Sequence, residues 1–251
     1  MSNRTKSILV AVSCLFMLVM TWLSSSWAFG GRTIEDVSYN ANEILVPAPF
    51  TFAIWGLIYI GMIAFTIYQL RKDTLHDSTI QKIRPRIALN FIANGLWLPA
   101  ATLLNRSWTT IVLILFMWFT LGYINKELKG YAHAKATKRY IVMPMSIYFG
   151  WITIATPLNM ASLVNQRGFT PAVQSVPRVL FWIWLAFVTS IIVFTRLRYI
   201  SYIAVTLWAL IGVIAVRHYD APFVSRIAIF LFMATILYIF VRGSQKKLLW
   251  Q

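Results

Sequence analysis

Residues 47–69 read PAPFTFAIWGLIYIGMIAFTIYQ, a stretch without a single charged side chain. The hydrocarbon core of a bilayer is about 30 Å thick, so a spanning helix needs about 20 mainly apolar residues. The apolar side chains run continuously here rather than alternating with polar ones, which is typical of a helix and not of a barrel strand. The stretch therefore predicts a transmembrane helix over about residues 50–70.

The same pattern recurs along the whole chain. Of its 251 residues, 59% are hydrophobic and 12% are charged, and the mean hydropathy is +0.68, outside the range of an ordinary soluble domain. Charged segments separate eight apolar runs, over residues 7–27, 50–70, 86–104, 108–125, 140–163, 178–196, 199–216 and 223–241. We predict an all-α polytopic membrane protein with eight transmembrane helices. The first run follows two basic residues, as a signal peptide would, but its length favours a retained helix.

The formal charge of +16 does not indicate a nucleic-acid partner, because Lys and Arg lie in short segments between the apolar runs. With a cytoplasmic amino terminus, seventeen of the 23 basic residues fall inside and five fall outside. The remaining one, Arg226, lies near the start of the last helix. Two basic inner loops are expected, over residues 71–86 and 125–139. This distribution predicts a multi-pass protein of a bacterial inner (cell) membrane with both termini cytoplasmic.

Several amide side chains lie inside the predicted helices. No Asp, Glu or Lys lies at the centre of a predicted helix, which disfavours an ion-coupled pump. Cys14 is the single cysteine and the three histidines fall in separate loops, so we predict no metal site. Asn90 and Asn94 are four residues apart and share one helix face. Such amides either hold helices together, at about 0.6–2 kcal/mol each, or line a pocket.

Three strings in successive helices resemble the TspO/MBR family of tryptophan-rich sensory proteins and translocator proteins. The first has Trp and Tyr four residues apart after a proline pair, the second has two Asn followed by Trp, and the third has Tyr, Trp, Ala, Asn and Asn at the family's intervals. The matching residues are Trp55 and Tyr59; Asn90, Asn94 and Trp97; and Tyr148, Trp151, Ala155, Asn159 and Asn165.

The resemblance implies a five-helix TspO-like bundle over residues 1–166 and three extra transmembrane helices over residues 167–251. In this family, helices one, two and five and the first loop enclose a ligand cavity. Carried over, the ligand-binding residues are Trp55, Tyr59, Asn94, Trp97, Trp151 and Ala155. Support for the pocket is expected from Asn90, Tyr148, Asn159 and Asn165.

The function implied by the resemblance is that of a non-enzymatic membrane receptor or carrier with a sensory or regulatory role. Its ligand would be a tetrapyrrole, porphyrin or haem, or a similar apolar molecule, because flat aromatic walls stack on a flat macrocycle. No obligatory cofactor is implied, and the expected partners are the lipid bilayer, the ligand and a second copy of the chain. Two other functions stay open: a membrane-complex assembly or structural subunit, and light-dependent degradation of tetrapyrroles. The Trp, Ala and Asn pattern also fits a simple packing face.

Overall fold

The computed structural model describes residues 1–26, 36, 45–103, 108–131, 135–166, 176–219 and 221–244. The long helices in this part of the chain are α1 (Asn3–Ser25), α3 (Ile54–Tyr68), α5 (Ser78–Leu103), α6 (Trp108–Glu127), α8 (Met143–Gln166), α9 (Val176–Leu197), α10 (Ile200–Arg217) and α11 (Pro222–Ser244). Shorter elements join them: the 3-10 helix η2 (Pro49–Ala53), α4 (Lys72–Leu75), α7 (Lys135–Thr137) and the π-helix η3 (Lys138–Val142).

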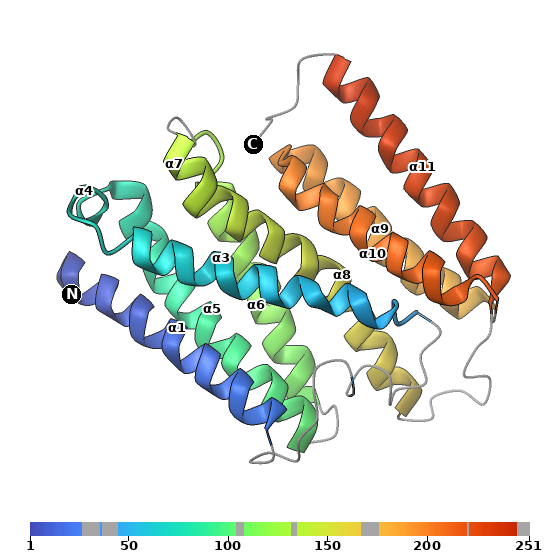
Figure 1. Cartoon of the computed structure of the whole chain (residues 1–251), viewed down its shortest axis with the longest axis horizontal. Helices are drawn as coiled ribbons and strands as arrows, with labels where there is room; N and C mark the ends of the chain where they lie inside the picture. Colours follow the sequence, from blue (N-terminus) through green and yellow to red (C-terminus); the bar gives the residue numbers. More distant parts are fainter. Residues whose placement is uncertain are drawn as a thin grey trace.

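Within the described residues, seven helices are long and apolar enough to cross a membrane, which confirms the prediction of an all-α polytopic membrane protein. The span that contains α3 includes η2, and the span that contains α8 includes η3. Eight spans were predicted, and the one not among these seven is the third predicted run, residues 86–104, which corresponds to α5; this helix has two Asn and two Pro within its length and is less apolar than the others. Figure 1 places the start of α1, α4, α7 and the end of α11 toward one end of the bundle.

The bundle is built around α8, the most buried of the candidate spans. On one flank, α6 packs on α8, α5 packs on α6, and α1 packs on α5. On the other flank α8 contacts α9 and α10, and α10 packs on α11 (Figure 1). Of the last three helices, α9 and α10 therefore pack directly against α8, the fifth predicted helix, and α11 packs on α10. The division of the chain at residues 166 and 167 stays a prediction about sequence.

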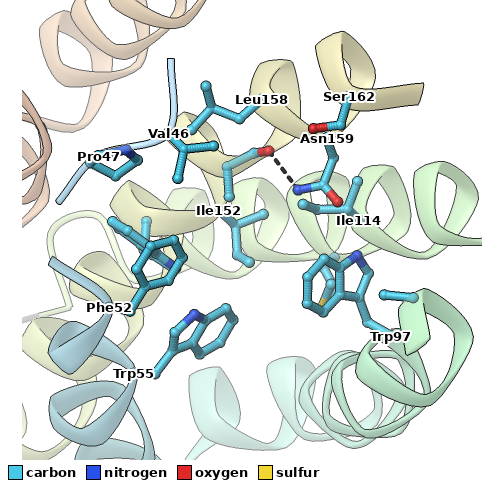
Figure 2. Close-up of a pocket in the computed structure, with 14 residues that line it drawn as sticks. Val46, Pro47, Phe52, Trp55, Trp97, Ile114, Ile152, Leu158, Asn159 and Ser162 are labelled. Atoms are coloured by element: carbon cyan, nitrogen blue, oxygen red, sulfur yellow. Dashed lines mark hydrogen bonds between the residues drawn. The ribbon is translucent and has the colours of Figure 1, made fainter. Parts of the chain in front are cut away.

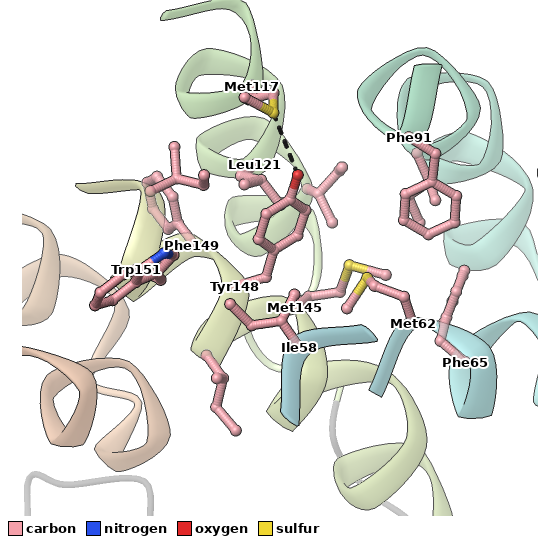
Figure 3. Packing of buried hydrophobic residues seen from close by; sticks show 14 of the residues in the cluster. Ile58, Met62, Phe65, Phe91, Met117, Leu121, Met145, Tyr148, Phe149 and Trp151 are labelled. Carbon is pink, nitrogen blue, oxygen red and sulfur yellow. Dashed lines mark hydrogen bonds between the residues drawn. The ribbon is translucent and has the colours of Figure 1, made fainter. Parts of the chain in front are cut away.

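Sulfur and aromatic side chains fill the centre of the bundle, where α3, α5, α6 and α8 meet (Figure 3). Met62 and Phe65 of α3 and Phe91 of α5 are fully buried there. Tyr148 of α8 is also completely buried, and its hydroxyl donates to Met117 Sδ at 3.3 Å. Flexible thioethers fill irregular gaps between rings, so this layer packs tightly without small residues at every position.

The first inner loop differs from its prediction. Residues 71–86 were expected to form a loop, but the structure forms α4 and then begins α5 at Ser78, eight residues before the predicted start. Asp77 explains the early start, because its carboxylate accepts from the Ile80 amide at 2.9 Å and so caps the helix. The same carboxylate accepts from the Tyr131 hydroxyl at 2.6 Å, and burial together with this acidic partner raises the pKa of Tyr131 above its ordinary value.

Arg84, counted in the sequence among the loop charges, is completely buried. Its guanidinium donates to Gln69 Oε1 at 2.8 Å and to three backbone carbonyls, those of Gln69, Thr74 and Leu75, at 2.8–3.2 Å. Gln69 in turn donates to the Ser7 carbonyl of α1 at 3.1 Å. The planar fork of Arg suits this set of acceptors, and a Lys ammonium would not reach them all. Arg84 therefore ties the α3–α5 connection to α1.

Replacing Arg84 with Met should lower the free energy of unfolding by about 3 kcal/mol or more, because several charge-assisted hydrogen bonds are lost and buried acceptors are left unpaired. Arg84→Lys should recover only part of this loss. The measurement is an unfolding titration with SDS in mixed micelles. Arg71→Met is the control, since Arg71 forms an exposed pair with Asp73 at 3.2 Å that should contribute at most about 1 kcal/mol. Equal effects of Arg84→Met and Arg71→Met would contradict the structural role of Arg84.

Candidate functional site

An aromatic-walled cavity lies between α3, α5, α6 and α8, and Figure 2 shows its lining. The side chains around it come from these four helices, from η2 and from the segment before η2. They are Val46, Pro47, Phe52, Trp55, Trp97, Ala101, Ile114, Met117, Trp151, Ile152, Ala155, Leu158, Asn159 and Ser162. None of them is charged, and the cavity is therefore a site for an uncharged or mostly apolar surface.

Three tryptophans form the walls, each from a different helix: Trp55 from α3, Trp97 from α5 and Trp151 from α8. The rings of Trp55 and Trp151 meet edge to face, with centroids 6.4 Å apart at 84°. Phe52 packs on Trp151 in the same manner, at 6.0 Å and 83°. These geometries fix the ring planes, because edge-to-face pairs are favoured by the ring quadrupoles.

The three indole N–H groups are the most unusual feature of the cavity. The exposed fractions of Trp55, Trp97 and Trp151 are only 8%, 7% and 3%, and none of their Nε1 atoms has a hydrogen-bond acceptor among the residues that the structure describes. A buried donor without an acceptor costs about 1–3 kcal/mol. In contrast, Trp118 donates to Thr153 Oγ1 at 3.2 Å and Trp208 donates to the Thr51 carbonyl at 2.9 Å. The cavity thus concentrates unused donors.

The polar side of the cavity is formed by Asn159 and Ser162, near the end of α8. Asn159 Nδ2 donates to the Ala155 carbonyl one turn earlier, at 2.9 Å, the dashed line in Figure 2. In that view the Asn159 amide lies above the Trp97 indole, across the cavity. The walls are therefore mainly aromatic, and their hydrogen-bonding groups lie toward the end of α8.

The structure brings together four of the six residues expected to bind ligand: Trp55, Trp97, Trp151 and Ala155. Tyr59 lies behind Trp55, stacked on it at 5.5 Å, with its hydroxyl 3.3 Å from Thr21 Oγ1 of α1. Asn94 is also outside the lining, because its amide donates to the Tyr148 hydroxyl at 2.6 Å.

Of the residues expected to support the pocket, one joins two helices, one lies in the core and one lines the cavity. Asn90 donates to the Met117 carbonyl at 3.1 Å and to Thr120 Oγ1 at 2.7 Å, so it joins α5 to α6. Tyr148 occupies the core beside Asn94, whereas Asn159 lies in the cavity wall itself. The side chain of Asn165 lies outside the described residues.

Part of the lining was missed from sequence. The resemblance implied that helix one helps to enclose the ligand cavity; α1 contributes no residue to the lining of this cavity, and α6 contributes Ile114 and Met117. The first loop lies mostly outside the described residues. The wall also includes Val46, Pro47 and Phe52. For these residues the sequence indicated only that a non-helical segment with prolines precedes α3.

The segment that carries Val46, Pro47 and Phe52 is attached to α10. The Ala48 amide donates to the Gly212 carbonyl at 3.0 Å, and Trp208 donates to the Thr51 carbonyl. A Cβ atom at position 212 would collide with Thr51 and Pro47, so glycine is what permits this close approach. One wall of the cavity is therefore held by a helix of the predicted carboxy-terminal extension.

The cavity is narrow. It encloses about 740 Å³ of space outside the atoms, its open mouth included, but the centre of a water molecule fits in only about 60 Å³ of it. Its lining contains no carboxylate, His, Lys or Cys, and so has none of the side chains that usually act as general acid or base. Such a lining can bind and orient a molecule by stacking and hydrogen bonding.

Comparison with known proteins gives one match. A family model described as TSPO-like protein matches residues 7–241, which includes α9, α10 and most of α11. The searches of curated proteins and of solved structures return no match. Because the family match extends over nearly the whole chain, and the aromatic cavity lies within it, the chain belongs to the TSPO-like protein family.

Proposed function

We propose that this protein is a non-enzymatic membrane receptor or carrier that binds a tetrapyrrole, such as a porphyrin or haem, or a similar apolar ligand in the cavity between α3, α5, α6 and α8. The observation that carries the proposal is the set of three buried indole N–H groups without acceptors around one uncharged cavity. A ligand with acceptor atoms on an aromatic frame would pair these donors, and that gain is available only when it is bound.

The chemistry of the walls supports a flat aromatic ligand. Trp55, Trp97 and Trp151 offer ring faces and edges for stacking, and Ala155 leaves space on the α8 side. Ring nitrogens or carbonyls of a tetrapyrrole would accept from the indoles, and Asn159 and Ser162 would meet polar substituents. The uncharged lining and the absence of acid–base groups within it support binding rather than catalysis.

The space open to the centre of a water molecule is only about 60 Å³, whereas ligand pockets usually measure about 300–1,000 Å³, so a tetrapyrrole needs more room than the cavity has. The proposal therefore requires one wall to move. The wall formed by Val46, Pro47 and Phe52 is the candidate, because it belongs to a non-helical segment and a short 3-10 helix rather than to a long helix. Its bonds to Gly212 and Trp208 would pass the displacement to α10. This is the basis that we propose for a sensory role.

We also propose that the protein lies in a bacterial inner membrane with both termini cytoplasmic. The support is the surplus of Lys and Arg near the start of α1, in the α3–α5 and α6–α8 connections and after α11. In this orientation the polar side of the cavity, at Asn159 and Ser162, is nearer the outer surface. Ligand would then enter from outside or from the outer leaflet.

Single Trp→Phe substitutions at positions 55, 97 and 151 should each weaken the binding of protoporphyrin or haem by about tenfold, since each removes one hydrogen bond but keeps an aromatic wall. The measurement is a visible absorbance titration of detergent-purified protein. Trp118→Phe is the matched control, because that indole is paired with Thr153 outside the cavity. A saturable Soret shift that is unaffected by all three substitutions, or no saturable shift at all, would contradict the proposal, and the latter would favour an assembly subunit.

Asn94→Leu should act on stability rather than directly on the ligand. It removes the hydrogen bond to the buried Tyr148 hydroxyl, so we expect a loss of about 1–2 kcal/mol in an SDS unfolding titration. Tyr148→Phe removes the same bond from the other side, and the double variant should be little worse than either single one. Additive losses would show that the two side chains are not coupled.

Gly212→Ala should weaken porphyrin binding by about tenfold or more although residue 212 does not line the cavity, because the new methyl group displaces the wall at Pro47 and Thr51. The same absorbance titration measures it. Gly56→Ala is the control, since a Cβ atom at position 56 meets nothing within 4 Å. Unchanged affinity in Gly212→Ala would sink the coupling between α10 and the site.

A further inference from the structure

A second cavity lies between α8, α9, α10 and α11, outside the site described above. Its walls are apolar side chains from the middle parts of these helices and from the segment before η2, with a single hydroxyl. The lining residues are Leu45, Pro47, Ile154, Leu158, Trp182, Ile183, Ala186, Phe187, Thr206, Ala209, Leu210, Val213, Ala228 and Leu231. It encloses about 570 Å³ of space outside the atoms, its opening included.

Thr206 carries the only hydroxyl of this lining. It is 1% exposed, and its hydroxyl has no hydrogen-bond partner among the described residues, as is also true of Thr51 elsewhere. Seven threonines of the long helices donate instead to a backbone carbonyl three or four residues earlier: Thr21, Thr102, Thr120, Thr153, Thr156, Thr195 and Thr235. This back-bonding is the ordinary way to satisfy a hydroxyl in a membrane helix. Thr206 instead keeps both its donor and its acceptor for another partner.

The cavity has an uncharged lining and borders a small apolar cluster. A small apolar cluster of Leu45, Val179, Ala221 and Val224 packs beside it, with Trp182 and Val213 against that cluster. No lining residue is charged, so nothing there would neutralise a phosphate or a carboxylate. The α9 side of the cavity belongs to the least buried of the candidate spans, which is therefore the side most open to hydrocarbon.

We propose that this cavity is a second binding site, for a neutral long-chain lipid that carries one hydroxyl or carbonyl oxygen. The hydrocarbon chain would lie among the side chains of α9, α10 and α11, and the oxygen would pair with Thr206 Oγ1. A charged headgroup is disfavoured by the uncharged walls. The inference does not depend on the tetrapyrrole proposal, although Pro47 and Leu158 line both cavities.

The test is photolabelling of the full-length protein in nanodiscs with a long-chain alcohol that carries a diazirine, followed by mapping of the labelled peptides. We expect saturable labelling of α9, α10 and α11 that excess unlabelled alcohol displaces and that the alkane of equal length displaces poorly. Thr206→Val keeps the shape and removes the oxygen, so it should raise the half-saturating concentration about tenfold. Thr235→Val is the matched control, because its hydroxyl is already satisfied by the Leu231 carbonyl.

A second variant keeps the test decisive if Thr206→Val is poorly folded. Ala186→Phe fills the cavity from α9, a helix that is mostly exposed, and it should abolish the saturable component while the protein still elutes as a monodisperse species. Labelling that never saturates would overturn the proposal. So would saturable labelling that is the same in wild type, Thr206→Val and Ala186→Phe.

Discussion

A hydrogen-bond donor buried among membrane helices has no water nearby. It therefore bonds to an acceptor in the protein or stays unpaired until a ligand binds. Many buried groups in this chain are paired: Arg84 with carbonyls of the α3–α5 connection, Asn94 with Tyr148, and Asn90 with α6. The indoles of Trp55, Trp97 and Trp151 are not paired within the described residues, and all three face one cavity. Other unpaired hydroxyls, such as those of Tyr199 and Ser225, lie outside the lining of that cavity, so among the described residues only the indoles are gathered around it.

The position of α10 makes the carboxy-terminal helices part of the site. Through Gly212 and Trp208, α10 holds the segment that forms one wall of the aromatic cavity. It also contributes Thr206, the hydroxyl in the lining of the second cavity. A ligand that moves the wall must therefore change the contacts of α10. This arrangement gives a short physical route from a binding event to the helices that were predicted as an extension.

Much of the fold was predictable because the hydrocarbon core imposes it: continuous apolar runs gave the long helices, and the Trp, Ala and Asn intervals pointed to four lining residues. The failures have physical causes. Arg84 reads as a loop charge because nothing in its neighbourhood shows that backbone carbonyls will surround it. In sequence, Asn94 matches a ligand-binding amide of the family. Only the fold shows that this amide donates to the Tyr148 hydroxyl instead. The cavity wall is attached to α10 through the backbone atoms of Ala48 and Thr51. Contacts of backbone atoms have no sequence signature.

The central claim is that the cavity indoles are free donors which a ligand engages. The most direct measurement is an NMR spectrum of protein with ¹⁵N-labelled tryptophan side chains in micelles, assigned by single Trp→Phe variants and recorded with and without protoporphyrin. We predict that the Nε1–H signals of Trp55, Trp97 and Trp151 lie at the shifts of unbonded indoles and change position with ligand, while that of Trp118, which is paired outside the cavity, stays in place. Cavity signals that already have bonded shifts without ligand, or that ignore its addition, would contradict it.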